Sequence, residues 1–329
     1  MSENQDAQLS TGGDPLPIGD SAGASVLSPE EFLALSGPRC AVLGSPVSHS
    51  LSPLIHKAGY RATGLDLDYY RVEAPEARDI RVIVQAQDPN IRGLSVTMPG
   101  KGAALELAGL ATKRAEDIGS ANTLVPQEDG RWLADNTDVD GLTACLDAVA
   151  AELAERDPER GAPFAGQTAV IVGNGGTARP AVAAAGAAGF AEINVVARSE
   201  RALNLQALTE SLGMAFSWTR FDAPELGHVC GQAATLISTV PEDVAAEYVD
   251  AFCRAESVID VIYDPYPTAL LAQAKQQELP FSDGLQMLAG QAEEQFRLFT
   301  GQQAPEGLFL TELRQHLALD QPGGLSSLA

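Results

Sequence analysis

Lys101 and Asp138 are the charged residues of this sequence best suited to move a proton. Lys101 follows Pro99 and Gly100 in a shaped loop, and desolvation in a cleft can lower the pKa of a lysine so that it acts in proton transfer. Asp138 stands just before a long predicted helix, where its carboxylate either pairs with Lys101 or only caps that helix. Because a lone lysine is most often a surface charge, these residues by themselves leave both interpretations open.

Neutral polar residues accompany this pair. Ser50 and Ser52 lie between a predicted strand and a predicted helix, where α/β sheets bind small anions, although Ser52 before Pro53 also fits an ordinary helix N-cap. Asn122 offers a donor and an acceptor to hydroxyl groups, and the helical spacing of Gln291 lets it point into a cleft. Such groups suit a polyhydroxylated ligand better than an apolar one.

A glycine-rich turn, Gly173-Asn-Gly-Gly-Thr-Ala178, directly follows the predicted strand 168–172 and precedes a predicted helix. In this Gly-x-Gly-x-x-Ala pattern the first glycine permits a tight turn, and the second lets the backbone approach a pyrophosphate. The small third residue lets the helix pack on the sheet. The helix N-terminus adds N–H donors and the positive end of its dipole. This context predicts a dinucleotide site rather than a turn that merely packs tightly.

The end of the next predicted strand, 192–196, indicates which dinucleotide binds. An NAD site usually has an acidic residue here for the ribose 2′-hydroxyl. This chain has Ala197 and then Arg198, with Ser199 and Arg201 nearby. An arginine offers a fork of donors suited to a 2′-phosphate. We therefore predict that the site binds NADP rather than NAD. The alternative is that Arg198 and Arg201 are only solvated residues at the start of a helix.

The elements that must position these residues alternate along the chain, which indicates βαβ units and a mostly parallel sheet. A polar, Pro/Gly-rich break at 156–166 separates two such series. The predicted strands are 40–43, 68–72, 93–97, 122–125, 132–134 (an edge strand), 168–172, 192–196, 235–238 and 258–261. The predicted helices start at an N-cap, Ser28, and continue with 53–62, 75–87, 101–108, 139–155, 177–188, 200–211, 268–277, 283–300 and 305–318.

Length and composition bound the function. A chain of 329 residues is typical of about two domains. A formal net charge of −23 disfavours nucleic-acid and membrane-surface roles, and the sequence has no apolar run long enough for a transmembrane helix. The four cysteines are widely and irregularly spaced. We therefore predict neither a disulfide framework nor a metal site. This use of cysteine fits a protein of the reducing cytosol.

Several motifs, in order and with matching gaps from about Cys40 to Gly301, together resemble the shikimate dehydrogenase family. They are Ser-x-Ser-Pro, Val-Thr-x-Pro-x-Lys, Ala-Asn-Thr, Asn-Thr-Asp-x-x-Gly, the glycine-rich turn, Tyr-x-Pro-x-x-Thr and Gly-x-x-Met-Leu-x-x-Gln-Ala. The resemblance implies a cytoplasmic enzyme that uses NADP(H) to reduce 3-dehydroshikimate reversibly to shikimate, in aromatic amino-acid biosynthesis.

The resemblance also implies a role for each matching residue. Lys101 and Asp138 would be the catalytic pair and contact the substrate. The other residues implied to bind the substrate are Ser50 and Ser52 at its carboxylate, with Tyr263 nearby, and Thr97, Asn122 and Gln291 at ring hydroxyls. The residues implied to bind the cofactor are Gly173, Asn174, Gly175, Gly176, Thr177, Ala178 and Arg179 at the pyrophosphate, Arg198, Ser199 and Arg201 at the 2′-phosphate, Ala197 beside the adenosine, and Thr239 and Gly284.

Two positions depart from the family pattern. Most members have Asn where Ser95 stands, and an Asn is common at the position of Ala197. A subgroup that uses NAD and also oxidises quinate carries an acidic residue at the end of the second strand, which is absent here. The rival functions are such an NAD-dependent quinate/shikimate dehydrogenase and a non-catalytic shikimate-binding regulator. The presence of both Lys101 and Asp138 argues against the regulator.

The implied fold is α/β with two domains. Residues 26–140 together with 283–320 would form a mostly parallel substrate-binding catalytic domain, on which the C-terminal helices pack back. Residues 141–282 would form a Rossmann-type NADP-binding domain. Residues 1–25, rich in Gly, Ser, Asp and Pro, are predicted to be a disordered tail rather than a signal peptide. The expected partners are small molecules, without nucleic acid or membrane, and the protein is expected to be a monomer or a homodimer.

Overall fold

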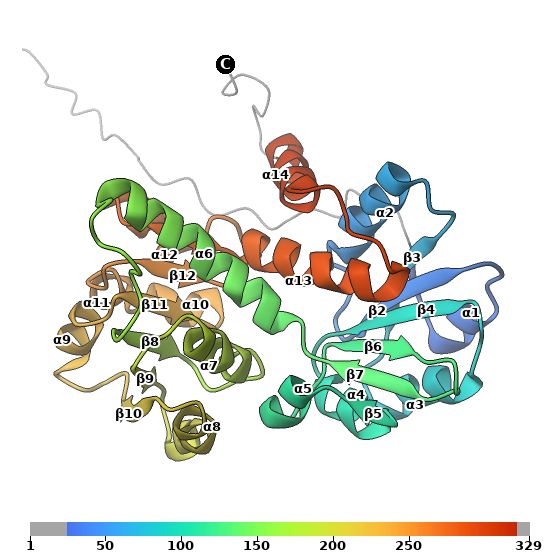
Figure 1. The fold of residues 1–329 in the computed structure, drawn as a ribbon, viewed down its shortest axis with the longest axis horizontal. Coiled ribbons are helices and arrows are strands. Elements are labelled where there is room, and N and C mark those ends of the chain that lie inside the picture. Colours follow the sequence, from blue (N-terminus) through green and yellow to red (C-terminus); the bar gives the residue numbers. More distant parts are fainter. Residues whose placement is uncertain (1–24, 321–329) are drawn as a thin grey trace, which may run out of the picture.

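The computed structural model describes residues 25–320, which fold around two β-sheets that lie side by side (Figure 1). The predicted tail, apart from Ser25, and the segment 321–329 lie outside the described residues. No helix in the described part of the chain is both long and apolar enough to cross a membrane.

The first sheet has seven strands in the order β1-β3-β2-β4-β6-β7-β5. They are β1 (Val26–Leu27), β2 (Arg39–Gly44), β3 (Asp68–Glu73), β4 (Ile91–Val96), β5 (Leu110–Ala111), β6 (Thr123–Pro126) and β7 (Trp132–Asp135). Strands β1 to β4 pair in parallel, and β6 runs antiparallel to both β4 and β7. The prediction of 132–134 as an edge strand is wrong, because the two-residue strand β5 pairs with β7 and forms the edge.

Five helices belong to this first half of the chain. They are α1 (Pro29–Leu33), α2 (Ser52–Thr63), α3 (Ala77–Ala86), α4 (Lys101–Leu107) and α5 (Lys113–Ile118). The predicted N-cap of α1 is confirmed: Ser28 Oγ accepts from the Glu31 N–H, while the Glu31 carboxylate accepts from the Ser28 N–H. This reciprocal pair satisfies two donors that the start of a helix would otherwise leave unpaired.

The second sheet is entirely parallel, in the order β10-β9-β8-β11-β12-β13. Its strands are β8 (Thr168–Val172), β9 (Glu192–Val196), β10 (Ala215–Thr219), β11 (Thr235–Ser238), β12 (Val258–Asp260) and β13 (Phe281–Asp283). Counted within this sheet, the order is 3-2-1-4-5-6, the arrangement of a Rossmann fold. The order reverses between β8 and β11, and in such sheets ligands bind at that crevice, outside the carboxyl ends of the strands.

The helices of the second half are α6 (Asp138–Arg156), α7 (Ala178–Ala187), α8 (Gln206–Ser211), α9 (Leu226–Gly231), α10 (Glu242–Ala246), α11 (Val249–Phe252), α12 (Ala269–Gln276), α13 (Gly284–Thr300) and α14 (Leu308–Asp320). The single helix predicted over 200–211 is wrong in detail, because the 3₁₀ helix η1 (Glu200–Leu205) precedes α8. Strands β10 and β13 and the short helices α5, α9, α10 and α11 were not predicted. None of these helices exceeds six residues, which is too short to show a helical period.

Helices α6 and α13 cross between the two sheets (Figure 1) and pack against each other. Two glycines allow the close approach. A Cβ on Gly141 would lie 2.4 Å from the Met287 carbonyl oxygen, and one on Gly290 would lie 2.7 Å from Ala144 Cβ. Beyond α13, helix α14 returns to α2 and buries Phe309 in the core that fills one side of the first sheet. The expected return of the C-terminal helices is confirmed.

Candidate active site

A cavity of about 490 Å³ lies between the carboxyl ends of strands from both sheets. It is lined by every residue that the sequence predicts for the substrate, namely Ser50, Ser52, Thr97, Lys101, Asn122, Asp138, Tyr263 and Gln291. It is also lined by part of the predicted cofactor set, namely Gly175, Gly176, Thr177, Thr239 and Gly284. The fold therefore brings the two predicted half-sites to one cavity.

The Lys101–Asp138 pair lies at this cavity. Lys101 Nζ is 2.5 Å from Asp138 Oδ2, and the two side chains are 16% and 3% exposed. Each residue is the first of its helix, α4 and α6. The alternative that Asp138 only caps α6 is wrong, because the N-cap residue is Thr137 and no side chain caps the helix. The carboxylate is thus free to hold the lysine ammonium group.

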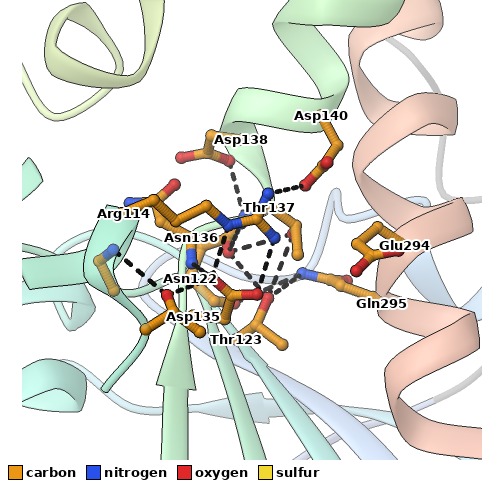
Figure 2. A network of polar contacts seen from close by, with 12 residues as sticks. Arg114, Asn122, Thr123, Asp135, Asn136, Thr137, Asp138, Asp140, Glu294 and Gln295 are labelled. Carbon is orange, nitrogen blue, oxygen red and sulfur yellow. Dashed lines mark hydrogen bonds and ion pairs between the residues drawn. The ribbon is translucent and has the colours of Figure 1, made fainter. Parts of the chain in front are cut away.

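Asn122 fixes the other oxygen of this carboxylate (Figure 2). Its Nδ2 donates to Asp138 Oδ1 at 2.8 Å. The same Nδ2 donates to Gln291 Oε1 at 3.0 Å. Its Oδ1 accepts from the Thr137 backbone N–H at 2.8 Å, which determines how the amide is turned. Among the described residues Gln291 Nε2 has no acceptor, so this donor is available to a ligand in the cavity. Sequence reasoning missed Thr137, although it stands inside the Asn-Thr-Asp motif.

The segment that carries Ser50 and Ser52, here called the serine loop, forms a second side of the cavity. Ser50 Oγ lies 3.2 Å from Ser52 Oγ and accepts from the Ser52 N–H at 3.3 Å. The interpretation of Ser52 as an N-cap is wrong, because the N-cap position of α2 is Leu51 and no side chain caps the helix. Burial raises the pKa of Tyr263, across the cavity, to about 12. Its phenol therefore stays protonated and can donate to an anion.

A buried arginine supports the serine loop. Arg71 on β3 is 4% exposed, and its Nε donates to the Ser50 carbonyl oxygen at 2.9 Å. Sequence reasoning missed this residue. The only available signal was a charged residue within the otherwise ordinary strand pattern of 68–72, and a pattern of that kind does not reveal which loop the side chain reaches.

An ion-pair brace holds the turn that leads to Asp138. Asp135 accepts from Arg114 Nε at 2.6 Å and from Arg114 Nη2 at 2.7 Å, and from Thr112 Oγ1 at 2.6 Å. Arg114 also lies 2.8 Å from Asp140 (Figure 2). Burial acts to raise the pKa of Asp135, but the hydrogen bonds from Arg114 and Thr112 outweigh it and lower that pKa. The end of β7 and the first turn of α6 are thereby both tied to α5.

The glycine-rich turn has the geometry that a pyrophosphate needs. Gly173 has φ +101°, and a Cβ there would lie 2.7 Å from Thr239 Oγ1. An added Cβ on Gly175 or Gly176 would meet no atom within 4 Å, so the backbone faces open space. Ala178 is fully buried against the sheet, as the third small position requires. The residues present therefore fit a dinucleotide phosphate.

The predicted 2′-phosphate residues lie just beyond β9. Arg198, Ser199 and Arg201 are exposed, and Ala197 is buried. Within residues 25–320 neither arginine forms an ion pair. Their guanidinium groups are therefore available to an anionic ligand.

Arg179 has a different surrounding from its neighbours in the turn. Its guanidinium donates to the Asp117 carbonyl at 2.8 Å, to the Asn204 carbonyl at 3.0 Å and to the Ile118 carbonyl. Asp117 and Ile118 end α5, so the arginine satisfies carbonyl groups that a helix end leaves unpaired. The Arg179 side chain therefore points to these carbonyl groups, and a contact with the pyrophosphate would come from its backbone.

No metal centre accompanies this site in the described residues. Between residues 25 and 320, no three His, Cys, Asp or Glu side chains are grouped so that they could hold a metal ion. The four cysteines are free and buried.

Comparisons with known proteins identify relatives of this chain. Residues 42–124 match the model of the shikimate dehydrogenase substrate binding domain, and residues 284–314 match the shikimate 5′-dehydrogenase C-terminal domain. The shikimate dehydrogenase (NADP(+)) of Methylobacterium radiotolerans is 35% identical over 292 residues, which are 88% of this chain and 100% of that protein.

Solved structures agree with this. The crystal structure of a shikimate 5-dehydrogenase from Mycobacterium fortuitum is 41% identical, covers 85% of this chain and 98% of its own, and has a TM-score of 0.74. The enzyme from Thermus thermophilus, solved in complex with NADP(H) and shikimate, is 31% identical. It covers 85% of this chain and 99% of its own, with a TM-score of 0.69.

Proposed function

The chain belongs to the shikimate dehydrogenase family, and from this premise we propose how its cavity works. The protein is an NADP-dependent oxidoreductase that interconverts 3-dehydroshikimate and shikimate in the shikimate pathway. One observation carries the assignment of the site: a single cavity is lined both by the Lys101–Asp138 pair and by the glycine-rich turn.

The substrate groups divide between two sides of the cavity. We propose that the hydroxyls of Ser50 and Ser52, with Tyr263 opposite, hold the carboxylate. The support is a pair of serine hydroxyls 3.2 Å apart and a phenol that keeps its proton. Thr97, Asn122 and Gln291 bind ring hydroxyls, because amides and hydroxyls both donate and accept hydrogen bonds.

Lys101 is the proton donor in the direction of reduction. As a ketone is reduced, negative charge builds on its oxygen, and an adjacent ammonium group stabilises that charge and then protonates the oxygen. Asp138 keeps the ammonium group in place through a 2.5 Å contact and a buried carboxylate. In the direction of oxidation, the proton of the substrate hydroxyl passes to Lys101. NADP(H), when bound, supplies or accepts the hydride.

The cofactor is held by the second sheet. Residues 173–179 hold the pyrophosphate, supported by the open space above Gly175 and Gly176. Arg198, Ser199 and Arg201 bind the 2′-phosphate, and Ala197 lies beside the adenosine. Thr239 and Gly284 complete the contacts from the cavity side.

Residues 26–140 with 283–320 act as the substrate domain, and 141–282 act as the cofactor domain. The division is supported by the two separate sheets and by the return of α13 and α14 to the first of them. We propose that the enzyme acts in the cytoplasm, where its four buried thiols would stay reduced. Its expected state is a monomer or a homodimer, without nucleic-acid or membrane partners.

The test is a spectrophotometric assay of NADPH formation with shikimate or quinate, each with NADP or NAD. We expect turnover with shikimate and NADP, and a much lower kcat/KM with NAD because Arg198 stands where NAD enzymes carry an acid. Equal efficiency with NAD and quinate would identify a quinate/shikimate dehydrogenase instead. Shikimate binding without turnover under any condition would identify a non-catalytic protein.

A further inference from the structure

Gln295 is a buried polar residue at the floor of the cavity that the proposed mechanism does not use. It is 3% exposed and lies on α13, one helical turn after Gln291. Residues four apart project from the same face of a helix. Gln291 thus points into the cavity, while Gln295 reaches the strand ends beneath it.

Both ends of the Gln295 amide are already hydrogen-bonded. Its Oε1 accepts from Ser95 Oγ at 2.7 Å. Its Nε2 donates to Thr123 Oγ1 at 3.0 Å and to the Asn122 carbonyl oxygen at 3.4 Å. Ser95 gives its proton to Gln295, so the Tyr69 hydroxyl must be the donor in its 2.6 Å contact with Ser95. A side chain with its amide so occupied positions other groups rather than binding the substrate itself.

The chain of hydrogen bonds continues to the catalytic pair (Figure 2). Because Thr123 Oγ1 accepts from Gln295, its own proton is directed to Asn122 Oδ1, 2.8 Å away. With its oxygen held in this way, Asn122 presents Nδ2 to Asp138 and to Gln291. Every link is a side chain that is at least half-buried, so water cannot easily replace a lost partner.

We propose that Gln295 is a positioning residue for the reaction, which acts through Thr123 on Asn122 and through α13 on Gln291. This rests on the proposed function, since Asn122 contacts the carboxylate of the proton-transfer pair. We call the chain of hydrogen bonds from Ser95 through Gln295 and Thr123 to Asn122 the relay, and none of these side chains is charged. Its neighbour His56, on α2, also stays uncharged because burial lowers the pKa of that imidazole to about 3.

The position of Ser95 explains why the relay is built this way. The short Ser95 side chain leaves room beneath α13 for the long Gln295 amide, to which Ser95 Oγ donates. The Tyr69 hydroxyl makes the second hydrogen bond of Ser95 Oγ. Loss of any one link leaves a buried donor or acceptor unpaired. The reaction requires the substrate to be held close to its reactive geometry. A small displacement of Asn122 or Gln291 is therefore enough to slow the reaction.

The test compares substitutions that separate hydrogen bonding from packing. Thr123→Val keeps the shape and removes the hydroxyl, whereas Thr123→Ser keeps the hydroxyl and removes a methyl group. Gln295→Met keeps the length of the side chain and removes its amide. We expect Thr123→Val and Gln295→Met each to lower kcat/KM for shikimate about tenfold, with KM for NADP within about twofold of wild type. Thr123→Ser should stay near wild type.

Phe296→Leu is the matched control. Phe296 is the next residue of α13 and is fully buried, but its ring lies in the aromatic cluster with His56 and Tyr60. The variant should lose thermal stability and keep kcat/KM. The double variant Thr123→Val/Gln295→Met should be no worse than the poorer single variant, because the two residues act through one chain of hydrogen bonds.

The activities of these variants distinguish a positioning role of Gln295 from a packing role. A folded Gln295→Met enzyme with wild-type kcat/KM overturns the positioning role. So does a Thr123→Ser variant that loses as much activity as Thr123→Val, since packing would then be the cause. If Gln295→Met does not fold, the Thr123 pair decides the question alone. A wild-type enzyme inactive with shikimate and NADP refutes the proposed function, whereas an active wild type with unaffected variants refutes the relay only.

Discussion

Lys101 and Asp138 are 37 residues apart in the sequence, yet Nζ lies 2.5 Å from Oδ2. Each residue opens its own helix, and the two helix starts meet at one cavity. The other oxygen of Asp138 is held by Asn122 at 2.8 Å. The carboxylate is therefore fixed through both of its oxygens, and the lysine ammonium group has a defined place.

Lys101→Ala should lower kcat by about 10²-fold or more, since it removes a general acid. KM for shikimate should change much less, because the carboxylate anchors remain. Asp138→Asn should also lower kcat and change the pH profile of the reaction. The losses should not add in the double variant, because groups that act as a unit are not independent. Steady-state rates with NADP and shikimate over a range of pH check this.

Lys113→Ala is the control for this prediction. Lys113 also lies in the first turn of a short helix and is paired with an aspartate, but it is 82% exposed and does not line the cavity. Its loss should leave kcat unchanged. A Lys101→Ala enzyme with wild-type kcat and only a raised KM would mean that Lys101 binds the substrate and the proton has another source.

Arg198→Ala should raise KM for NADP about tenfold or more and leave KM for NAD nearly unchanged. The guanidinium has no partner ion in the described residues, so its charge-assisted bond to a 2′-phosphate is worth roughly 1.5–3 kcal/mol. The measurement is KM for each cofactor at saturating shikimate. Arg131→Ala serves as the control, because Arg131 is an exposed arginine in the turn between β6 and β7 that does not line the cavity. Equal loss with both cofactors would refute the assignment of Arg198.

Ser50→Ala and Ser52→Ala should each raise KM for shikimate while NADP binding stays intact. Ser52 does not cap α2, whose N-cap position is Leu51, so for Ser52→Ala no loss of about 1 kcal/mol from a missing helix cap should appear in the free energy of unfolding. Kinetics and urea unfolding on the same samples check both parts. If stability falls by that amount and the substrate kinetics do not change, the hydroxyls serve the helix rather than the substrate.

Asp260→Asn should change how stability depends on pH. Asp260 is fully buried on β12 and accepts from Thr268 Oγ1 at 2.7 Å, and burial raises its pKa to about 6. In the unfolded chain this pKa is about 3.9. Between these two pH values the folded state binds the proton more tightly, so this group makes stability fall as pH rises through the window.

The variant lacks that dependence. The difference in free energy of unfolding between Asp260→Asn and wild type should therefore shift in favour of the variant by roughly 2–3 kcal/mol from about pH 4 to pH 6. It should then stay constant above that window. Urea unfolding at several pH values measures it. A difference that does not vary with pH would show that the carboxyl group is not perturbed in the folded protein.

Much of the fold follows from local pattern. Residues 169–172 of β8 are an unbroken run of apolar residues because a central parallel strand is buried on both faces, and the helix at Ser28 is marked by a capping box. Short elements behave differently. The two-residue strand β5 exists because Leu110 and Ala111 pair with Leu133 and Ala134 of β7, and no local pattern announces a partner of that kind.

By itself the sequence determined the βαβ alternation, the glycine-rich turn, the missing acid after β9 and the motifs that resemble shikimate dehydrogenases. These are local features, since periodicity, turn chemistry and short spacings act over neighbouring residues. The tertiary structure decided that Lys101 meets Asp138, that Arg71 supports the serine loop, that Arg179 turns away to α5, and that Gln295 lies beneath Asn122. Those contacts join residues from different elements, and their geometry depends on how the two sheets and α13 pack together.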